Sequence, residues 1–120
     1  MYVVIYQFYL KPETEETFKK AWHLVANYFK NSRGAIGSRL HKTTDDPNNM
    51  RWVAYSCWPD KTTRDASWPG ENAPSLELPN KAREAVLFMQ SCFDPDRKIP
   101  ELCLEVVDDM LKIPQHVKIP

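Results

Sequence analysis

Three polar side chains with hydrogen-bonding or acid–base capacity lie in strand-like stretches of the sequence. Gln7 and Tyr55 each lie inside a strand-like run, and His41 lies near the end of a third one. An amide or a phenol can hold an oxygen atom of a ligand, and an imidazole can act as a base because it titrates near neutral pH. Each residue also has a structural explanation. Gln7 could bond to the neighbouring main chain or lie at a subunit contact, Tyr55 could keep its ring in the core with its hydroxyl at the rim, and His41 could be solvated.

The residue types that bind metals are scattered along the chain. The three histidines, His23, His41 and His116, are far apart and share no ligand spacing. The three cysteines are odd in number and include no CxxC pair. This pattern indicates reduced thiols in a cytoplasmic protein rather than disulfides or a zinc site. We therefore expect no metal site.

Composition excludes several classes of partner. Sixteen basic and sixteen acidic residues cancel, and no stretch is basic enough to follow a phosphate backbone, so we expect no nucleic acid. No apolar run approaches the ~20 residues of a membrane span, and the short apolar start lacks the features of a signal peptide. With 120 residues, of which 42% are hydrophobic, the chain predicts a single domain over 1–120 with one core.

Hydrophobic periodicity predicts four strands and three helical segments. An apolar stripe of Phe18, Trp22, Val25 and Phe29 has helical spacing. The expected elements are a strand at 2–10, a helix at 13–31, a hairpin of 36–43 and 51–58, a short helix from Asp60 to about 68, a helix at 81–93 and a strand at 101–108. Residues 69–80 read as an irregular insertion, and 112–120 as a C-terminal tail. This order predicts an α+β, ferredoxin-like βαββαβ fold, with an antiparallel sheet and helices on one face.

The strands are apolar on both faces, which points to a homodimer. In residues 2–10 both alternating sets of side chains are largely apolar, and the strands at 51–58 and 101–108 are nearly so. Two helical segments can cover only one face, so the other would expose a large apolar patch. A second copy packed sheet to sheet about a two-fold axis would cover that face. The alternative is that 69–80 or the tail covers it.

A series of features in residues 1–68 resembles a known family. An apolar strand ends in Lys11-Pro12 before an acidic helix start, and Trp58-Pro59-Asp60 closes the hairpin. The other elements of the series are Phe18, Trp22, Gly34, Gly37, Leu40, Asp46-Pro47 and Trp68. Together these residues are similar to the antibiotic biosynthesis monooxygenase family of dimeric α/β barrels, and the last strand fits loosely.

The resemblance implies a pocket and a chemistry. Members of that family oxygenate quinols, anthrones and related polyphenols, often with no metal or flavin, in a pocket between sheet and helices. It implies that Trp68 lines such a pocket and that Gln7 takes the place of an Asn found in some relatives, although Trp68 could equally be plain core. Relatives often carry a His in the second helix, which is the axial ligand in the haem-degrading branch. Leu78 stands at that position here, which disfavours haem degradation.

The leading hypothesis is an enzyme, a cofactor-independent monooxygenase acting on a small quinol or polyphenol with O2. Gln7, Tyr55, Trp68 and His41 would line its pocket. The alternative is a non-catalytic dimeric module of the same fold that binds a small aromatic molecule or a protein. Haem binding or degradation comes third.

Overall fold

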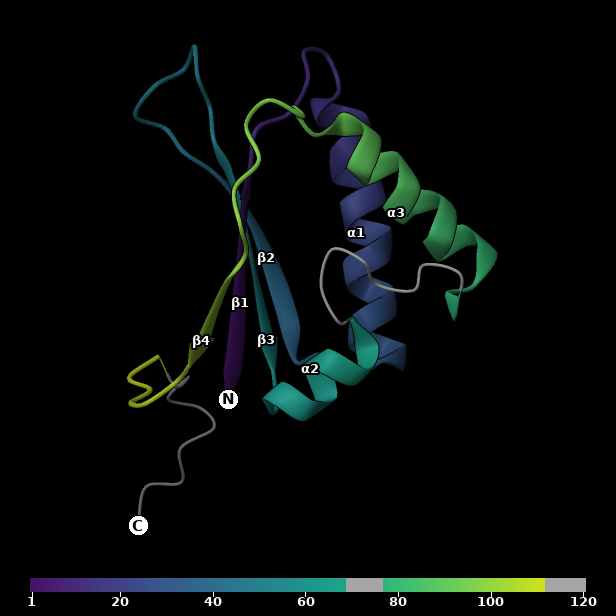
Figure 1. The fold of residues 1–120 in the computed structure, drawn as a ribbon, viewed down its shortest axis with the longest axis vertical. Coiled ribbons are helices and arrows are strands. Elements are labelled where there is room, and N and C mark those ends of the chain that lie inside the picture. The colour runs from purple at the N-terminus through teal and green to yellow at the C-terminus, as the bar shows by residue number, and fades with distance from the viewer. Residues whose placement is uncertain (69–76, 112–120) are drawn as a thin grey trace.

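The strands form one antiparallel sheet, and the helices lie together on one of its faces (Figure 1). The computed structural model describes residues 1–68 and 77–111. Within them the elements are β1 (Tyr2–Phe8), α1 (Glu15–Ser32), β2 (Gly37–Lys42), β3 (Trp52–Trp58), α2 (Lys61–Ser67), α3 (Asn80–Cys92) and β4 (Leu102–Glu105). The strand order is β2-β3-β1-β4, and all three pairings are antiparallel. The predicted α+β, ferredoxin-like fold is confirmed.

Local signals in the sequence fix the ends of two helices. The Asp60 side chain, at the predicted start of the short helix, caps α2 by accepting a hydrogen bond from the main-chain N–H of Thr63 at 2.7 Å. Helix α1 ends at Ser32, and Gly34 follows with a φ of +80°. A Cβ atom at Gly34 would lie 3.0 Å from the Thr63 methyl group. Glycine is therefore required here both by the left-handed backbone and by the close approach of α2.

Several element ends differ from the prediction. Strand β1 ends at Phe8 rather than at residue 10, and Leu10 forms only an isolated bridge with Phe93. Strand β4 covers only Leu102–Glu105, because β1 offers it partners only from Tyr2 to Ile5. Helix α3 begins at Asn80, one residue before the predicted start, and the Asn80 side chain accepts a hydrogen bond from Arg83. The tail 112–120 and most of the predicted insertion, residues 69–76, lie outside the described residues.

The core lies between the sheet and helices α1 and α3. Alternation along β1 directs Val4 and Phe8 towards the helices, where both are buried. The predicted stripe of α1 and the apolar face of α3 meet them, with Phe18 and Phe29 from α1 and Val86 from α3 in the same two clusters. The helical periodicity therefore predicted the inward faces of both helices.

The opposite sheet face is apolar as well. The strand register brings together Val3, Ile5, Tyr55, Cys57, Leu102 and Leu104 on this side, which we call the open face. Leu102 and Leu104 keep 47% and 39% of their surface exposed. In the described part of the chain, no helix is long and apolar enough to cross a membrane.

Candidate functional site

A cavity of about 620 Å³ lies between the helix-facing side of the sheet and helices α1 and α3. Its size falls within the range of small-molecule sites, about 300–1,000 Å³. Residues from β1, β2, β3, both helices and the segment 93–101 surround it. The aromatic members of its wall are Tyr6, Phe8, Trp22, Phe29, Trp58, Trp68 and Phe93.

Phe29 is at the centre of one aromatic wall. Its ring lies 6.3 Å from the Trp58 ring and 5.7 Å from the Trp68 ring, at interplanar angles of 74° and 86°. Such edge-to-face contacts are favourable and hold the rings in fixed orientations. The Trp58 indole N–H also donates to the Ser56 hydroxyl at 3.2 Å, which fixes the second ring from the sheet side. A planar ligand would therefore meet a rigid aromatic surface.

Residues 93–101 close another side of the cavity. Arg97 stacks over the Tyr9 ring, with its guanidinium carbon 4.4 Å from the ring centre. It also lies 3.6 Å from the Asp94 carboxylate and bonds to Asn49 in the β2–β3 hairpin loop. These contacts tie the segment to the end of β1 and to the hairpin, and they place Asp94 and Arg97 on the cavity wall.

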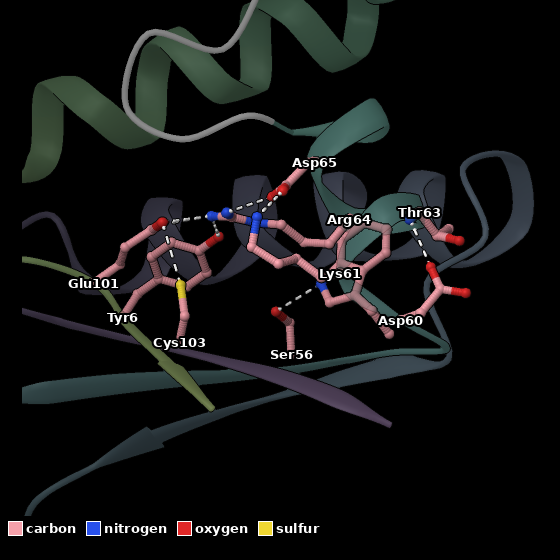
Figure 2. A network of polar contacts seen from close by, with 10 residues as sticks. Tyr6, Ser56, Asp60, Lys61, Thr63, Arg64, Asp65, Glu101 and Cys103 are labelled. Carbon is pink, nitrogen blue, oxygen red and sulfur yellow. Dashed lines mark hydrogen bonds and ion pairs between the residues drawn. The ribbon is translucent and has the colours of Figure 1, made fainter. Parts of the chain in front are cut away.

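One end of the cavity is polar, and its main contacts are drawn in Figure 2. Tyr6 and Glu101 line the cavity, and Arg64 from α2 joins them. The Arg64 Nη2 group donates to both Glu101 carboxylate oxygens, at 2.7 and 2.6 Å, and to the Tyr6 hydroxyl at 3.4 Å. The Arg64 Nη1 group donates to Asp65 at 3.2 Å. We call Tyr6, Arg64 and Glu101 the polar triad.

Arg64 is the only charged or polar residue that is buried in the described part of the chain, at 4% exposure. An arginine stays protonated in proteins, so its charge needs compensation. Glu101 and Asp65 supply two negative charges, and Lys61, 2.5 Å from Asp65, supplies a second positive one. The Lys61 contact lowers the pKa of Asp65, and Arg64 adds to this effect. The four charges cancel, but the buried Arg64 Nε–H has no hydrogen-bond partner among the described residues.

Burial raises the pKa of Tyr6 above its ordinary value of 10.0, although the hydrogen bond from Arg64 acts in the opposite direction. Its hydroxyl therefore keeps its proton at neutral pH. The group can donate a hydrogen bond into the cavity, but it cannot act as an anionic base there.

The sequence-predicted site residues divide between the two faces of the sheet. Trp68 and Gln7 border the cavity. Gln7 lies between Tyr6 and Phe8, whose side chains pack on the helix side, so alternation directs the Gln7 side chain to the open face. Tyr55 and His41 are not on the cavity wall. Tyr55 pairs with Ile5, and the exposed His41 bonds to the Val53 carbonyl at 3.1 Å.

The polar triad was not identified from the sequence. Arg64 and Glu101 are 37 positions apart and become neighbours only when α2 packs against the sheet, which it contacts at β3. One signal was present in Tyr6, whose hydroxyl lies in an apolar strand face and must find a partner if buried. The same argument was applied to Gln7 on the other face.

Leu78, compared in the sequence with a His of the second helix, lies just before α3 rather than within it. It is 7% exposed and belongs to the core cluster that contains Phe29, against which Trp68 also packs. An aliphatic side chain at this point offers neither a ligand for iron nor an acid–base group.

Comparison with known proteins shows similarity in structure only. No family model and no curated protein matches the sequence. A protein from Nitrosomonas europaea named as a candidate antibiotic biosynthesis monooxygenase aligns with a TM-score of 0.64 at 18% identity, over 90% of this chain and 100% of that one. A variant of SnoaB, a cofactor-independent oxygenase from Streptomyces nogalater, aligns with a TM-score of 0.65 at 14% identity, over 92% and 97%. A further antibiotic biosynthesis monooxygenase gives 0.62 at 16% identity, over 90% and 100%.

The chain has the fold of the antibiotic biosynthesis monooxygenases. The neighbours cover nearly all of this chain and of their own, so the similarity extends over the whole arrangement of sheet and helices. The resemblance drawn from the sequence is confirmed at the level of the fold. At these identities the monooxygenase fold does not by itself specify a substrate or a reaction.

Proposed function

We propose that the protein is a cofactor-independent monooxygenase that acts on a small quinol or polyphenol. The observation that carries the proposal is the aromatic-walled cavity of about 620 Å³ with one polar end, in the fold shared with the oxygenase SnoaB. The walls suit a planar ring, and the polar end suits an oxygen substituent on that ring.

The substrate would supply the electrons in this reaction. A phenol that loses its proton becomes an electron-rich anion, which can reduce O2 directly. One oxygen atom enters the ring at a C–H position and becomes a carbonyl, the ring loses two hydrogen atoms, and the second oxygen atom leaves as water. The protein would hold the anion, orient the ring and keep water away. Trp68 is the proposed cavity residue retained from the sequence, and the polar triad joins it; the Gln7 side chain is directed to the open face.

A second candidate is a non-catalytic module that binds a small aromatic molecule. Leu78 favours it, since the position that carries a His in many relatives has no proton-transferring group here. This module would be stabilised by ligands without turning them over.

We also propose that residues 1–120 form one domain, which works as a homodimer in the cytoplasm. The apolar open face, with Leu102 and Leu104 partly exposed, supports a second copy packed against it. The free thiols of Cys57, Cys92 and Cys103 are typical of a reducing compartment.

Oxygen uptake by metal-stripped protein across a panel of quinols, catechols and anthrones tests the enzymatic proposal. Uptake above the uncatalysed rate that falls in Trp68→Ala but not in Gln7→Ala, whose side chain is directed to the open face, supports it. No uptake with any member of the panel, combined with thermal stabilisation by the same compounds, favours the binding module.

A further inference from the structure

The hydrogen bonds of Tyr6 leave its own proton directed away from Arg64. A guanidinium has only donors, so the Tyr6 oxygen must be the acceptor in the 3.4 Å contact with Arg64 Nη2. The hydrogen bonds of the described residues include no acceptor for the Tyr6 proton. Because Tyr6 lines the cavity, that proton is available to a ligand inside it.

Arg64 strengthens Tyr6 as a donor. A positive charge that donates to the phenol oxygen polarises the O–H bond, and hydrogen bonds in series reinforce one another in a low-dielectric environment. Arg64 is buried at 4% exposure, so water screens this effect little.

Glu101 determines where the guanidinium lies. Both of its carboxylate oxygens accept from the same Nη2 group that contacts Tyr6. Asp65 holds Nη1 from the other side, and Figure 2 shows Arg64 reaching between these partners. Glu101 and Asp65 balance the charges of Arg64 and Lys61. An anionic ligand atom at Tyr6 would therefore bind next to a group of four side chains whose net charge is zero.

We infer that the Tyr6 hydroxyl is the donor that binds an ionised oxygen of an aromatic ligand, while Arg64 polarises it and Glu101 positions Arg64. The ligand class is an aromatic phenolate, because the cavity walls are aromatic and Tyr6 can donate but cannot accept a proton from the ligand. This inference rests on the proposed function for its site and adds the group that recognises the reacting form of the substrate.

Two probes of similar shape test the inference by binding alone. The absorption of 4-nitrophenol differs between its neutral and ionised forms, and 4-nitroanisole has the same ring without an acidic oxygen. In wild-type protein we expect 4-nitrophenolate to bind more tightly than 4-nitroanisole, and the bound phenol to ionise at lower pH than in water. Tyr6→Phe should reduce the preference for phenolate roughly 10- to 100-fold, the effect of one hydrogen bond to a charged group.

Tyr28→Phe is the matched control. The Tyr28 hydroxyl also accepts a hydrogen bond from an arginine, Arg33 Nε at 3.0 Å, but Tyr28 is not on the cavity wall. This variant should keep the preference for phenolate. Arg64→Lys, which keeps the charge but loses the planar donor group, should show a partial loss and a smaller pKa shift of the bound probe.

Equal preference for phenolate in wild type and Tyr6→Phe would overturn the inference, as would the failure of both probes to bind. Loss of preference in Arg64→Lys but not in Tyr6→Phe would also overturn it, because Arg64 would then contact the ligand directly. The proposed function fails separately, since a protein that prefers phenolate through Tyr6 but consumes no oxygen refutes the monooxygenase and not the phenolate site.

Discussion

Removing Glu101 should leave the buried charge of Arg64 poorly compensated. Breaking a buried ion pair typically costs roughly 3–5 kcal/mol of stability. The Glu101 side chain is 25% exposed and Asp65 remains beside Arg64, so part of this cost is relieved by water and by the second carboxylate. We therefore expect Glu101→Ala to lower the free energy of unfolding by about 2–3 kcal/mol, which corresponds to a fall in Tm of roughly 6–15 °C.

Urea unfolding at pH 7 measures this difference in the free energy of unfolding. The protein concentration is kept fixed, because dimerisation would make stability depend on it. Glu84→Ala, at an exposed site on α3, is the control. The double variant Arg64→Met with Glu101→Leu should recover most of the loss, since an apolar pair needs no charge compensation. A loss within about 0.5 kcal/mol for Glu101→Ala, the range of an ordinary surface substitution, would refute the reasoning.

Three further predictions concern other parts of the fold. Leu104→Glu on the open face should convert a dimer to monomers in sedimentation analysis. Leu87→Glu, at a 52% exposed site on α3, is the control and should leave the dimer intact. Unchanged sedimentation of both variants would argue against the sheet-to-sheet dimer. The raised pKa of Tyr6 means that above pH 10.0 the unfolded chain binds fewer protons than the folded one, so wild-type stability falls as pH rises there. Tyr6→Phe should show a shallower fall in unfolding experiments between about pH 9 and 11, and an equally steep fall would contradict the assignment. Gly34→Ala should lose about 1–2 kcal/mol in the same assay, because its φ of +80° disfavours a side chain and the Thr63 methyl group is close; a gain in stability would contradict this account.

The sequence predicted the order and type of the elements well because each carries a local signal. Strands β1 and β3 are apolar runs that end before prolines, and the apolar stripes of α1 and α3 have helical spacing. Element ends were less predictable where a partner strand decides them. Strand β4 is short because of the extent of its pairing with β1, and this is not encoded in residues 101–108 alone.

The site was harder to predict because both faces of the strands are apolar. Without a polar face, alternation cannot say which side meets the helices, and so Tyr55 and His41 could not be distinguished from cavity residues. In the structure Tyr6 lies on the helix side, on the same strand face as Val4 and Phe8. Arginine and glutamate usually lie on protein surfaces, so nothing in the sequence marks Arg64 or Glu101. Only tertiary contacts bury Arg64 and bring Glu101 next to it.

The central claim is that an aromatic ring is oxidised by O2 in the cavity between sheet and helices. An isotope-labelling experiment tests this claim most directly. Metal-stripped protein acts on the best quinol of the panel under isotopically labelled dioxygen, and mass spectrometry counts the labelled oxygen atoms in the product. Ala26 lies on α1 at the cavity wall, and Ala66 is exposed on α2, so Ala26→Phe fills the cavity and Ala66→Phe is its control. The account predicts one labelled oxygen atom in the product with wild type and Ala66→Phe, and at least a tenfold lower yield with Ala26→Phe. An unlabelled product, or an equal yield from Ala26→Phe, would contradict it.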